Sequence, residues 1–134
     1  MKLATIRQTK FIPAEPDEVY NAFMNAKTHA AFTGAKATCN AKVGGKFTAW
    51  DGYITGKNLK LKKGELIVQQ WKTTEWPKSY PYSTLEFSFK PKKRGTQVKM
   101  VQSNVPASQA ANYRQGWVDA YWNPLRRYFQ ARKK

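Results

Sequence analysis

The stretch that most constrains the fold is residues 113–129, YRQGWVDAYWNPLRRYF, in which six of seventeen side chains are aromatic. At the spacing of an α-helix, about 3.6 residues per turn, its large apolar side chains share one face, with Gln115, Asp119 and Arg127 opposite. A helix with such a face must be covered by another layer. We expect a helix from about residue 106 to residue 131 whose apolar face packs on a sheet through Tyr113, Trp117, Val118, Tyr121, Trp122, Leu125, Tyr128 and Phe129.

Two residues of this helix are poor helix formers. Gly116 costs roughly 1 kcal/mol relative to alanine in a helix interior, which predicts a close approach of the backbone to another element. Pro124 removes one hydrogen bond from the helix and predicts a bend toward a curved partner.

The partner sheet is predicted between residues 36 and 104, where apolar residues recur with a period of two. Turn sequences separate these segments: GG at 44–45, DG at 51–52, KKG at 62–64, a proline-rich loop at 77–81 and KKRG at 92–95. The clearest strand, LEFSFK, turns Leu85, Phe87 and Phe89 to one side. These segments favour an antiparallel meander.

Before the meander, residues 2–12 resemble a strand, and two short helices follow. PDEVYNAFMNA has acidic residues in its first turn, and the helix at THAAF is expected to have Thr28 as its cap and to end at Gly34. We predict one α+β domain over residues 1–134: a curved antiparallel sheet of about six or seven strands around a long C-terminal helix, with a frayed basic tail at 132–134.

Composition restricts the class of protein. The hydrophobic content of 41% is typical of a globular chain, and no window approaches the roughly 18 apolar residues of a membrane span. Cys39 is the only cysteine, which excludes an internal disulfide and favours a reducing, cytoplasmic setting. Lys and Arg exceed Asp and Glu by 16, so anionic partners are a possibility to test, although charge alone says nothing about fold.

Four stretches in order, HAAFTGAKA, KVGGKFTAWDGYITGKNL, IVQQWKTTEWP and YRQGWVDAYWNPLRRYF, resemble the family named for the activator of heat-shock protein 90 ATPase. That family lies within the SRPBCC superfamily, also called START-like or Bet v 1-like. The resemblance implies the helix-grip fold, a hydrophobic ligand between sheet and helix, and a co-chaperone type of interaction. It extends only to the family's C-terminal-type domain, whereas a separate N-terminal domain engages the chaperone.

We expect the space between sheet and helix to be a ligand cavity lined by Trp50, Trp71, Phe87, Met100, Arg114, Trp117 and Tyr121. Ordinary core packing is the competing explanation for each aromatic. Arg114 falls at the centre of the aromatic arc, where it needs an anion such as Glu86, Glu75 or a ligand head group, unless it extends past the rings to solvent. Asn58 stands where relatives often have an aromatic residue, which would open or hydrate the cavity.

Catalytic and metal-binding patterns are not found in the sequence. His29 is the only histidine and is expected to face solvent or to cap a helix, and Asp51 with Gly52 predicts a two-residue hairpin turn. No cofactor or metal is expected, and an enzyme of the cyclase or hydratase kind is the third alternative.

The second alternative is electrostatic. If the meander is regular, alternate hairpins share one end of the sheet, and the C-terminal residues return there. The loop with Lys42 and Lys46 would join this end, together with Lys133 and Lys134. The resulting basic pole, which would bind nucleic acid or an acidic protein, has at its centre Lys60, Lys62, Lys63, Lys90, Lys92, Lys93, Arg94 and Arg132.

Overall fold

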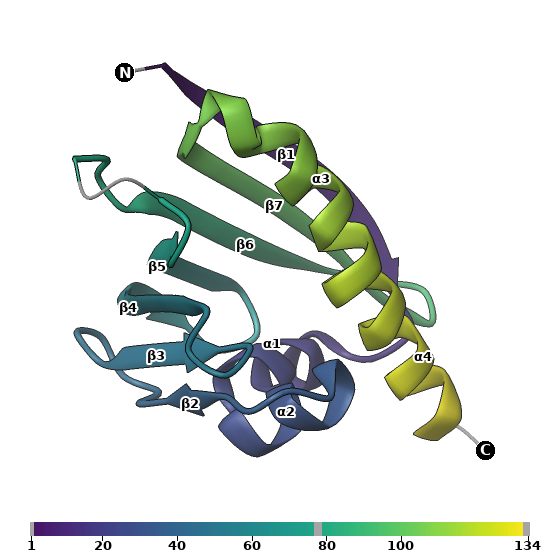
Figure 1. Cartoon of the computed structure of the whole chain (residues 1–134). Coiled ribbons are helices and arrows are strands. Elements are labelled where there is room, and N and C mark those ends of the chain that lie inside the picture. The colour runs from purple at the N-terminus through teal and green to yellow at the C-terminus, as the bar shows by residue number, and fades with distance from the viewer. Residues whose placement is uncertain (1, 77–78, 133–134) are drawn as a thin grey trace.

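A computed structural model describes residues 2–76 and 79–132, and has a seven-stranded sheet. The sheet is curved, and a long helix crosses it (Figure 1). All neighbouring strands are antiparallel, in the order β1-β7-β6-β5-β4-β3-β2, so β1 and β2 form the two edges. The strands are β1 (Leu3–Ile12), β2 (Thr38–Cys39), β3 (Lys46–Ala49), β4 (Ile54–Lys62), β5 (Leu66–Thr73), β6 (Ser83–Lys92) and β7 (Gly95–Pro106). The predicted α+β helix-grip fold is confirmed.

The sheet follows from local sequence. In β6, Leu85, Phe87 and Phe89 are buried whereas Glu86 and Lys90 are exposed, as the alternation predicts. The turns at 62–64 and 92–95 connect β4 to β5 and β6 to β7 as expected, and the loop between β5 and β6 includes residues 77 and 78, which lie outside the described residues.

The hairpin between β3 and β4 differs from the prediction. Ala49 pairs with Ile54, so the connection has four residues, Trp50 to Tyr53, and the predicted two-residue turn is wrong. Trp50 and Asp51 both have positive φ, 53° and 58°. Asp51 is held by Lys36, whose backbone N–H donates to the Asp51 carboxylate at 3.1 Å, while the Asp51 N–H donates to the Lys36 carbonyl at 3.0 Å. These two hydrogen bonds to Lys36, in the segment before β2, favour the four-residue loop over a two-residue turn.

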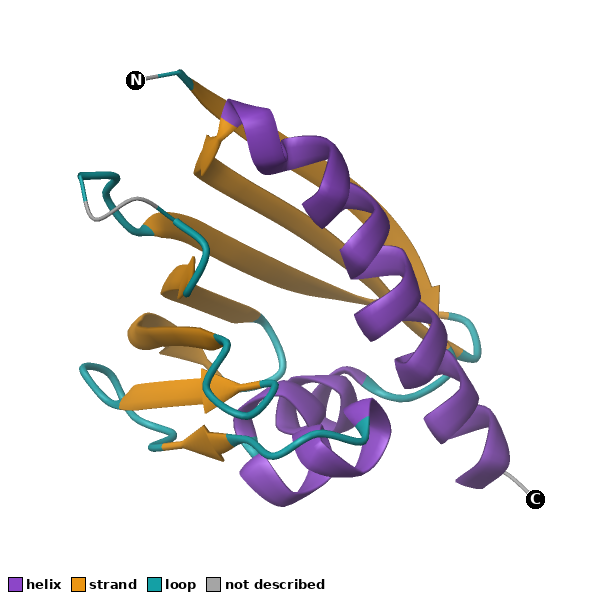
Figure 2. Cartoon of the chain, in the orientation of Figure 1, coloured by secondary structure: helices purple, strands orange, loops and turns teal. Residues whose placement is uncertain are grey.

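Two short helices cover one end of the sheet (Figure 2). α1 (Pro16–Met24) begins with a proline and two acidic residues, which suit a helix N-terminus. α2 (Ala26–Thr33) is capped by Asn25, whose Oδ1 accepts from the Thr28 N–H at 3.0 Å, so the predicted Thr28 cap is wrong. α2 ends at Gly34, which has a φ of 78°.

The C-terminal helix is continuous in Figure 2 and comprises η1 (Ala107–Gln109), α3 (Ala110–Trp117), the π turn η2 (Val118–Trp122) and α4 (Asn123–Arg132). Within the π turn the Asn123 N–H donates to the Val118 carbonyl, one residue further back than in an α-helix. Pro124 follows directly, and the widened turn accommodates a residue that lacks an N–H. The predicted inward face is confirmed, since Trp117, Tyr121, Trp122, Leu125 and Phe129 are buried.

Gly116 does not approach another element. A Cβ added there would meet nothing within 4 Å beyond the helix's own nearby backbone, so the close approach predicted from sequence is wrong. The glycine instead lies beside open space, where the helix gains nothing from the missing side chain.

Replacing Gly116 with alanine is therefore expected to raise the free energy of unfolding by about 0.5–1 kcal/mol, the helix-propensity difference. Urea unfolding followed by circular dichroism measures this change. Gly56→Ala is the matched control, because its Cβ would clash with the Gln70 carbonyl and the Phe47 ring and should destabilise the protein. Destabilisation by Gly116→Ala would contradict the open position.

Candidate ligand-binding cleft

An open cleft of about 560 Å³ lies between the β3–β4 loop, β5 and the C-terminal helix. Its volume falls in the range of roughly 300–1,000 Å³ that is usual for small-molecule sites. Rings dominate its walls: the aromatic lining residues are Trp50, Tyr53, Trp71, Tyr113, Trp117 and Tyr121, and the remaining ones are Ile54, Glu75, Asn112, Gly116 and Ala120.

The interior between the sheet and the helix is nearly filled. Beneath the cleft, bordered by Phe23, His29 and Phe87 among others, a void of only about 30 Å³ remains, which suits a water molecule rather than a ligand. The space for a ligand is therefore the open cleft beside the helix, and not an enclosed cavity under it.

The residues expected around a cavity are divided by the structure. Trp71, Trp117 and Tyr121 border both the cleft and the small void, Trp50 borders only the cleft, and Phe87 borders only the void. Met100 is fully buried and borders neither space. Its bulk fills the core under the helix.

Arg114 is exposed and borders neither space, so its predicted place among the cavity residues is wrong, and its exposure agrees with the alternative in which it extends to solvent. The π turn explains the error. One extra residue within a helix rotates everything beyond it by about 100° relative to a regular wheel. On a regular helical wheel, the inward residues before and after residues 118–122 therefore occupy two different arcs. Arg114 falls at the middle of the two arcs combined, but it lies on the inward face of neither half of the helix.

A hydrogen-bond chain fixes the inner wall of the cleft. The Trp117 indole N–H donates to Gln102 Oε1 at 2.9 Å, Gln102 Nε2 donates to Ser83 Oγ at 3.2 Å, and Ser83 Oγ donates to the Trp71 carbonyl at 2.6 Å. Gln102 is fully buried and was missed in the sequence. Its position, two residues after Met100 on an inward-facing strand pattern, was the available signal.

Another part of the cleft wall is held together by hydrogen bonds of Tyr113, on α3. Its hydroxyl accepts from the Trp76 indole N–H at 2.8 Å and donates to Gln109 Oε1 at 2.7 Å. Nearby, the Tyr53 hydroxyl donates to Glu75 Oε2 at 2.8 Å. Burial, and secondly this bond, raise the pKa of Tyr53 well above its ordinary value, so the phenol remains a neutral donor at the cleft.

His29 is buried, with 8% of its surface exposed, so the expected solvent-facing or capping role is wrong. Its Nε2 lies 3.2 Å from the Tyr121 hydroxyl. Burial lowers the pKa of His29 to about 4 and raises that of Tyr121, which keeps both groups neutral near pH 7.

Asn58 neither opens nor hydrates the core, contrary to expectation. It is fully buried in β4, and its Nδ2 donates to the carbonyls of Asn40 and Lys42 at 2.9 and 3.2 Å. Its Oδ1 accepts from Gln69 Nε2 at 2.9 Å. The amide thus holds the loop between β2 and β3 against the sheet.

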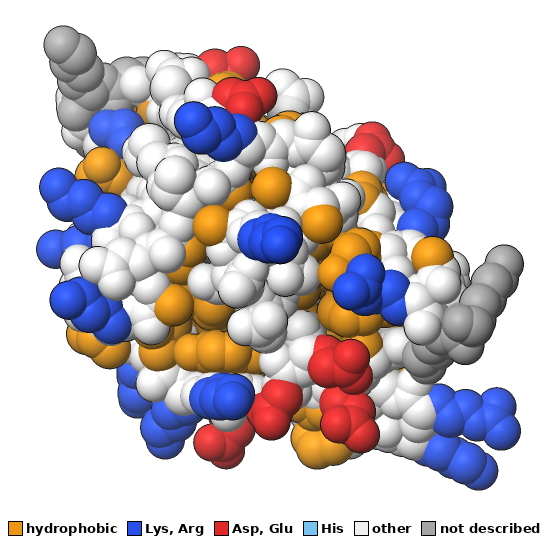
Figure 3. All heavy atoms as spheres, turned by 90° about the horizontal axis from the view of Figure 1, so that it is seen from below, with side chains coloured by type: hydrophobic (Ala, Val, Ile, Leu, Met, Phe, Trp, Pro, Cys, Tyr) orange, Lys and Arg blue, Asp and Glu red, His pale blue; other side chains and the backbone are white. Residues whose placement is uncertain are grey.

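The basic pole is only partly assembled. The side chain of Asp17 lies against Gly64 in the β4–β5 turn, and Glu15 and Glu18 share a hollow with Lys92 and Arg94 of the β6–β7 turn. Both turns thus adjoin the acidic first turn of α1. The remaining pole residues of these strands and turns are exposed, namely Lys60, Lys62, Lys63, Lys90 and Lys93. Acidic and basic side chains also lie side by side on the face in Figure 3.

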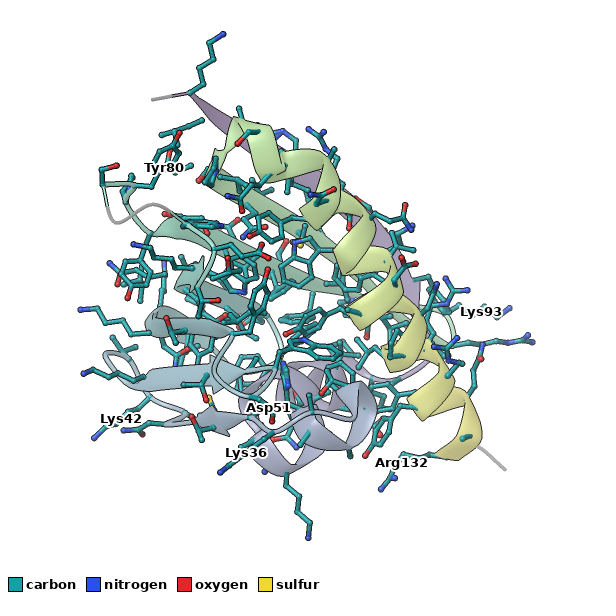
Figure 4. The ribbon with its side chains drawn as sticks, viewed as in Figure 1. Lys36, Lys42, Asp51, Tyr80, Lys93 and Arg132 are labelled. Carbon is teal, nitrogen blue, oxygen red and sulfur yellow. The ribbon has the colours of Figure 1, made fainter. Side chains whose placement is uncertain are left out.

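Lys42 does not belong to this pole. Figure 4 places Lys42 and Lys93 on opposite sides of the molecule, because the sheet twists so strongly that its hairpin ends do not stay aligned. Arg132 ends α4 on the side of Lys93, with its guanidinium 4.7 Å from the centre of the Tyr128 ring. Lys133 and Lys134 lie outside the described residues.

Two further observations concern the described part of the chain, residues 2–76 and 79–132. None of its helices combines the length and the apolar character needed to cross a membrane. No group of three or more His, Cys, Asp or Glu side chains in it is arranged to hold a metal ion.

Comparison with known proteins adds sequence relatives. The family model described as Activator of Hsp90 ATPase homolog 1-like protein matches residues 13–130. The human Activator of 90 kDa heat shock protein ATPase homolog 1 is 32% identical over 114 residues, which cover 85% of this chain and 33% of that protein. The chain thus spans about a third of the length of the curated relatives it matches.

Solved structures agree with the fold. An HSP90 activator from Plasmodium falciparum has a TM-score of 0.82 at 28% identity, over 89% of this chain and 91% of that one. Ara h 8.0201 has a TM-score of 0.76 at 9% identity, over 97% and 99% of the two chains, which shows a shared fold alone.

Proposed function

Because the chain belongs to the family of Activator of Hsp90 ATPase homolog 1-like proteins, we propose that it is a binding protein whose open cleft holds a small hydrophobic molecule. The observation that carries this proposal is the cleft of about 560 Å³ walled by six aromatic side chains. The wider superfamily that the sequence resembles binds hydrophobic molecules between sheet and helix, and the cleft lies along that same boundary.

The cleft has the composition of a ligand site rather than of a reactive centre. Aromatic walls gain affinity by burying apolar surface, and a few polar groups set orientation. Here the polar contributions come from Glu75, Asn112 and the tyrosine hydroxyls. Thermal-shift measurements and native mass spectrometry against fatty acids, sterols and flavonoids test the proposal, and absence of any shift or mass adduct with every class would overturn it.

A side chain at Gly116 should block the cleft. Because this glycine lines the cleft and has open space around it, Gly116→Leu is expected to weaken binding of the uncharged dye N-phenyl-1-naphthylamine by about tenfold or more. Dye fluorescence measures the affinity. Ala111→Leu is the matched control, since Ala111 is exposed on α3 and does not line the cleft. Equal dye affinity in both variants would contradict a site in the cleft.

A second candidate function is association with Hsp90. It is favoured by the likeness to an HSP90 activator from Plasmodium falciparum, which this chain matches over 91% of its length at 28% identity. Titration of purified Hsp90 into the isotope-labelled chain, followed by NMR, tests for contact, with the human relative as positive control. Unchanged spectra at Hsp90 concentrations that saturate the control would overturn this candidate.

A further inference from the structure

Resting on the proposed cleft function, we propose a narrower ligand class: the cleft selects a small organic cation, an ammonium ion that carries an aromatic or branched alkyl group. The proposal comes from the charges and ring faces of the lining residues. It separates this site from one for fatty acids or other hydrophobic anions.

The charge of the residues that line the cleft differs from the charge of the chain as a whole. The protein has a net charge of +16, yet the described residues that line the cleft include neither lysine nor arginine. Their one carboxylate is Glu75. A site for a hydrophobic anion would need a cation or several N–H donors facing it, whereas a carboxylate repels such a ligand.

Among the described residues, two cations that neighbour the lining in sequence, Lys72 and Arg114, lie outside the cleft. In β5 the buried side chains of Trp71 and Thr73 face the helix, so Lys72 between them faces the other side of the sheet. There its Nζ lies 5.4 Å from the centre of the Tyr82 ring and 3.4 Å from the Tyr80 carbonyl oxygen. Arg114 follows the lining residue Tyr113 in the C-terminal helix, but it is exposed and does not line the cleft.

The aromatic rings that line the cleft meet one another at several angles rather than in one parallel stack. The centroids of Trp117 and Tyr121 are 4.7 Å apart with ring planes at 43°, and those of Trp50 and Tyr121 are 6.3 Å apart at 73°. Trp71 and Tyr113 meet edge to face at 87°. The walls therefore meet at several angles, and ring faces of this kind attract quaternary ammonium groups.

Glu75 is positioned to complete this arrangement. The Tyr53 hydroxyl, which also lines the cleft, donates to Glu75 Oε2 at 2.8 Å and fixes the carboxylate at the wall. An ionised carboxylate accepts several hydrogen bonds, so Glu75 retains capacity for an ammonium group while it holds Tyr53. Aromatic faces and a fixed anion together favour a cation over an uncharged molecule of the same shape.

Three probes that share a benzyl group test the charge preference: benzyltrimethylammonium, its uncharged carbon isostere neopentylbenzene, and the anion phenylacetate. NMR titrations that follow the tryptophan indole N–H signals measure each affinity. We expect the cation to bind about tenfold or more tighter than the isostere, and the anion to bind weakest.

Charge variants assign the preference to Glu75. Glu75→Gln is expected to lower affinity for the cation about tenfold and to change that for neopentylbenzene much less. Glu86→Gln removes the same charge from an exposed position on β6 outside the cleft and should change neither affinity.

The outcomes separate the two proposals. Equal affinity for cation and isostere, or a preference for phenylacetate, would overturn cation selection while the hydrophobic cleft stands. An equal effect of both variants would overturn the role assigned to Glu75. Failure of all three probes, together with failure of the uncharged dye, would overturn the cleft function and this inference with it.

Discussion

Replacing Trp122 with alanine is expected to lower the free energy of unfolding by about 3–5 kcal/mol, the cost of removing a large buried aromatic side chain. Trp122 is fully buried at the end of the π turn. Its ring packs edge to face on Phe87, with centroids 6.1 Å apart, and its indole N–H donates to Gln8 Oε1 at 2.6 Å. Since Gln8 Nε2 also donates to the Arg114 carbonyl at 3.0 Å, the substitution removes one of the two hydrogen bonds by which Gln8 joins β1 to the helix.

Urea unfolding measures this loss, which is a large part of the roughly 5–15 kcal/mol typical of a domain. Trp50→Ala is the matched control, because Trp50 is only half-buried and should lose markedly less. Trp122→Phe retains a ring but loses the hydrogen bond, and we expect about 1–3 kcal/mol for it. A loss for Trp122→Ala no greater than that for Trp50→Ala would contradict the assigned packing.

Acid is expected to destabilise the protein through His29. Its pKa falls from 6.5 to about 4 on folding because burial disfavours the charged ring. Between these values the unfolded chain binds a proton that the folded chain does not, so stability is complete above pH 6.5 and declines as the pH falls toward 4. The expected decline is about 3 kcal/mol over that range.

His29→Gln tests the assignment, because an amide can face Tyr121 without titrating. Unfolding free energies at intervals between pH 7 and pH 5 should decline in the parent protein and stay nearly level in the variant. His29 is the only histidine, and ordinary carboxyl groups titrate chiefly below this range. The same slope in both proteins would show that another group causes the pH dependence.

Local patterns account for the parts of the fold that were predicted correctly. The alternation of Leu85, Phe87 and Phe89 identifies a strand, and the spacing of Trp117, Tyr121 and Leu125 identifies the inward face of the helix. Each pattern depends only on the spacing of side chains within one helix or strand. It can therefore be recognised without knowing which elements pack against it. The family resemblance added the order in which the elements assemble.

The buried polar residues were not predictable in the same way. His29 meets Tyr121, Asn58 meets Gln69, and Gln102 meets Trp117, so the partners come from other elements. Without those partners, a polar residue in a sequence is more often assigned to the surface. Their pairing became visible only with the fold complete.

The sequence predicted most of the aromatic residues that line the cleft, but not that the cleft is open and lies beside the helix. Trp50, Trp71, Trp117 and Tyr121 do lie together, whereas Arg114 was displaced by a helical irregularity that no regular wheel contains. Whether the space under the helix is filled depends on how far the sheet closes around it. That closure is set by twist accumulated over seven strands, which a single segment does not record.

The two edges of the sheet determine where the surplus charge would oppose self-association. An outermost strand can pair with a strand of another molecule, and β1, ten residues long, is the more inviting of the two edges. β1 carries two cationic side chains, Arg7 and Lys10. Two copies of the protein, each with a net charge of +16, would repel each other as their edges approach. Added salt screens that repulsion, so self-association by strand addition becomes easier as ionic strength rises.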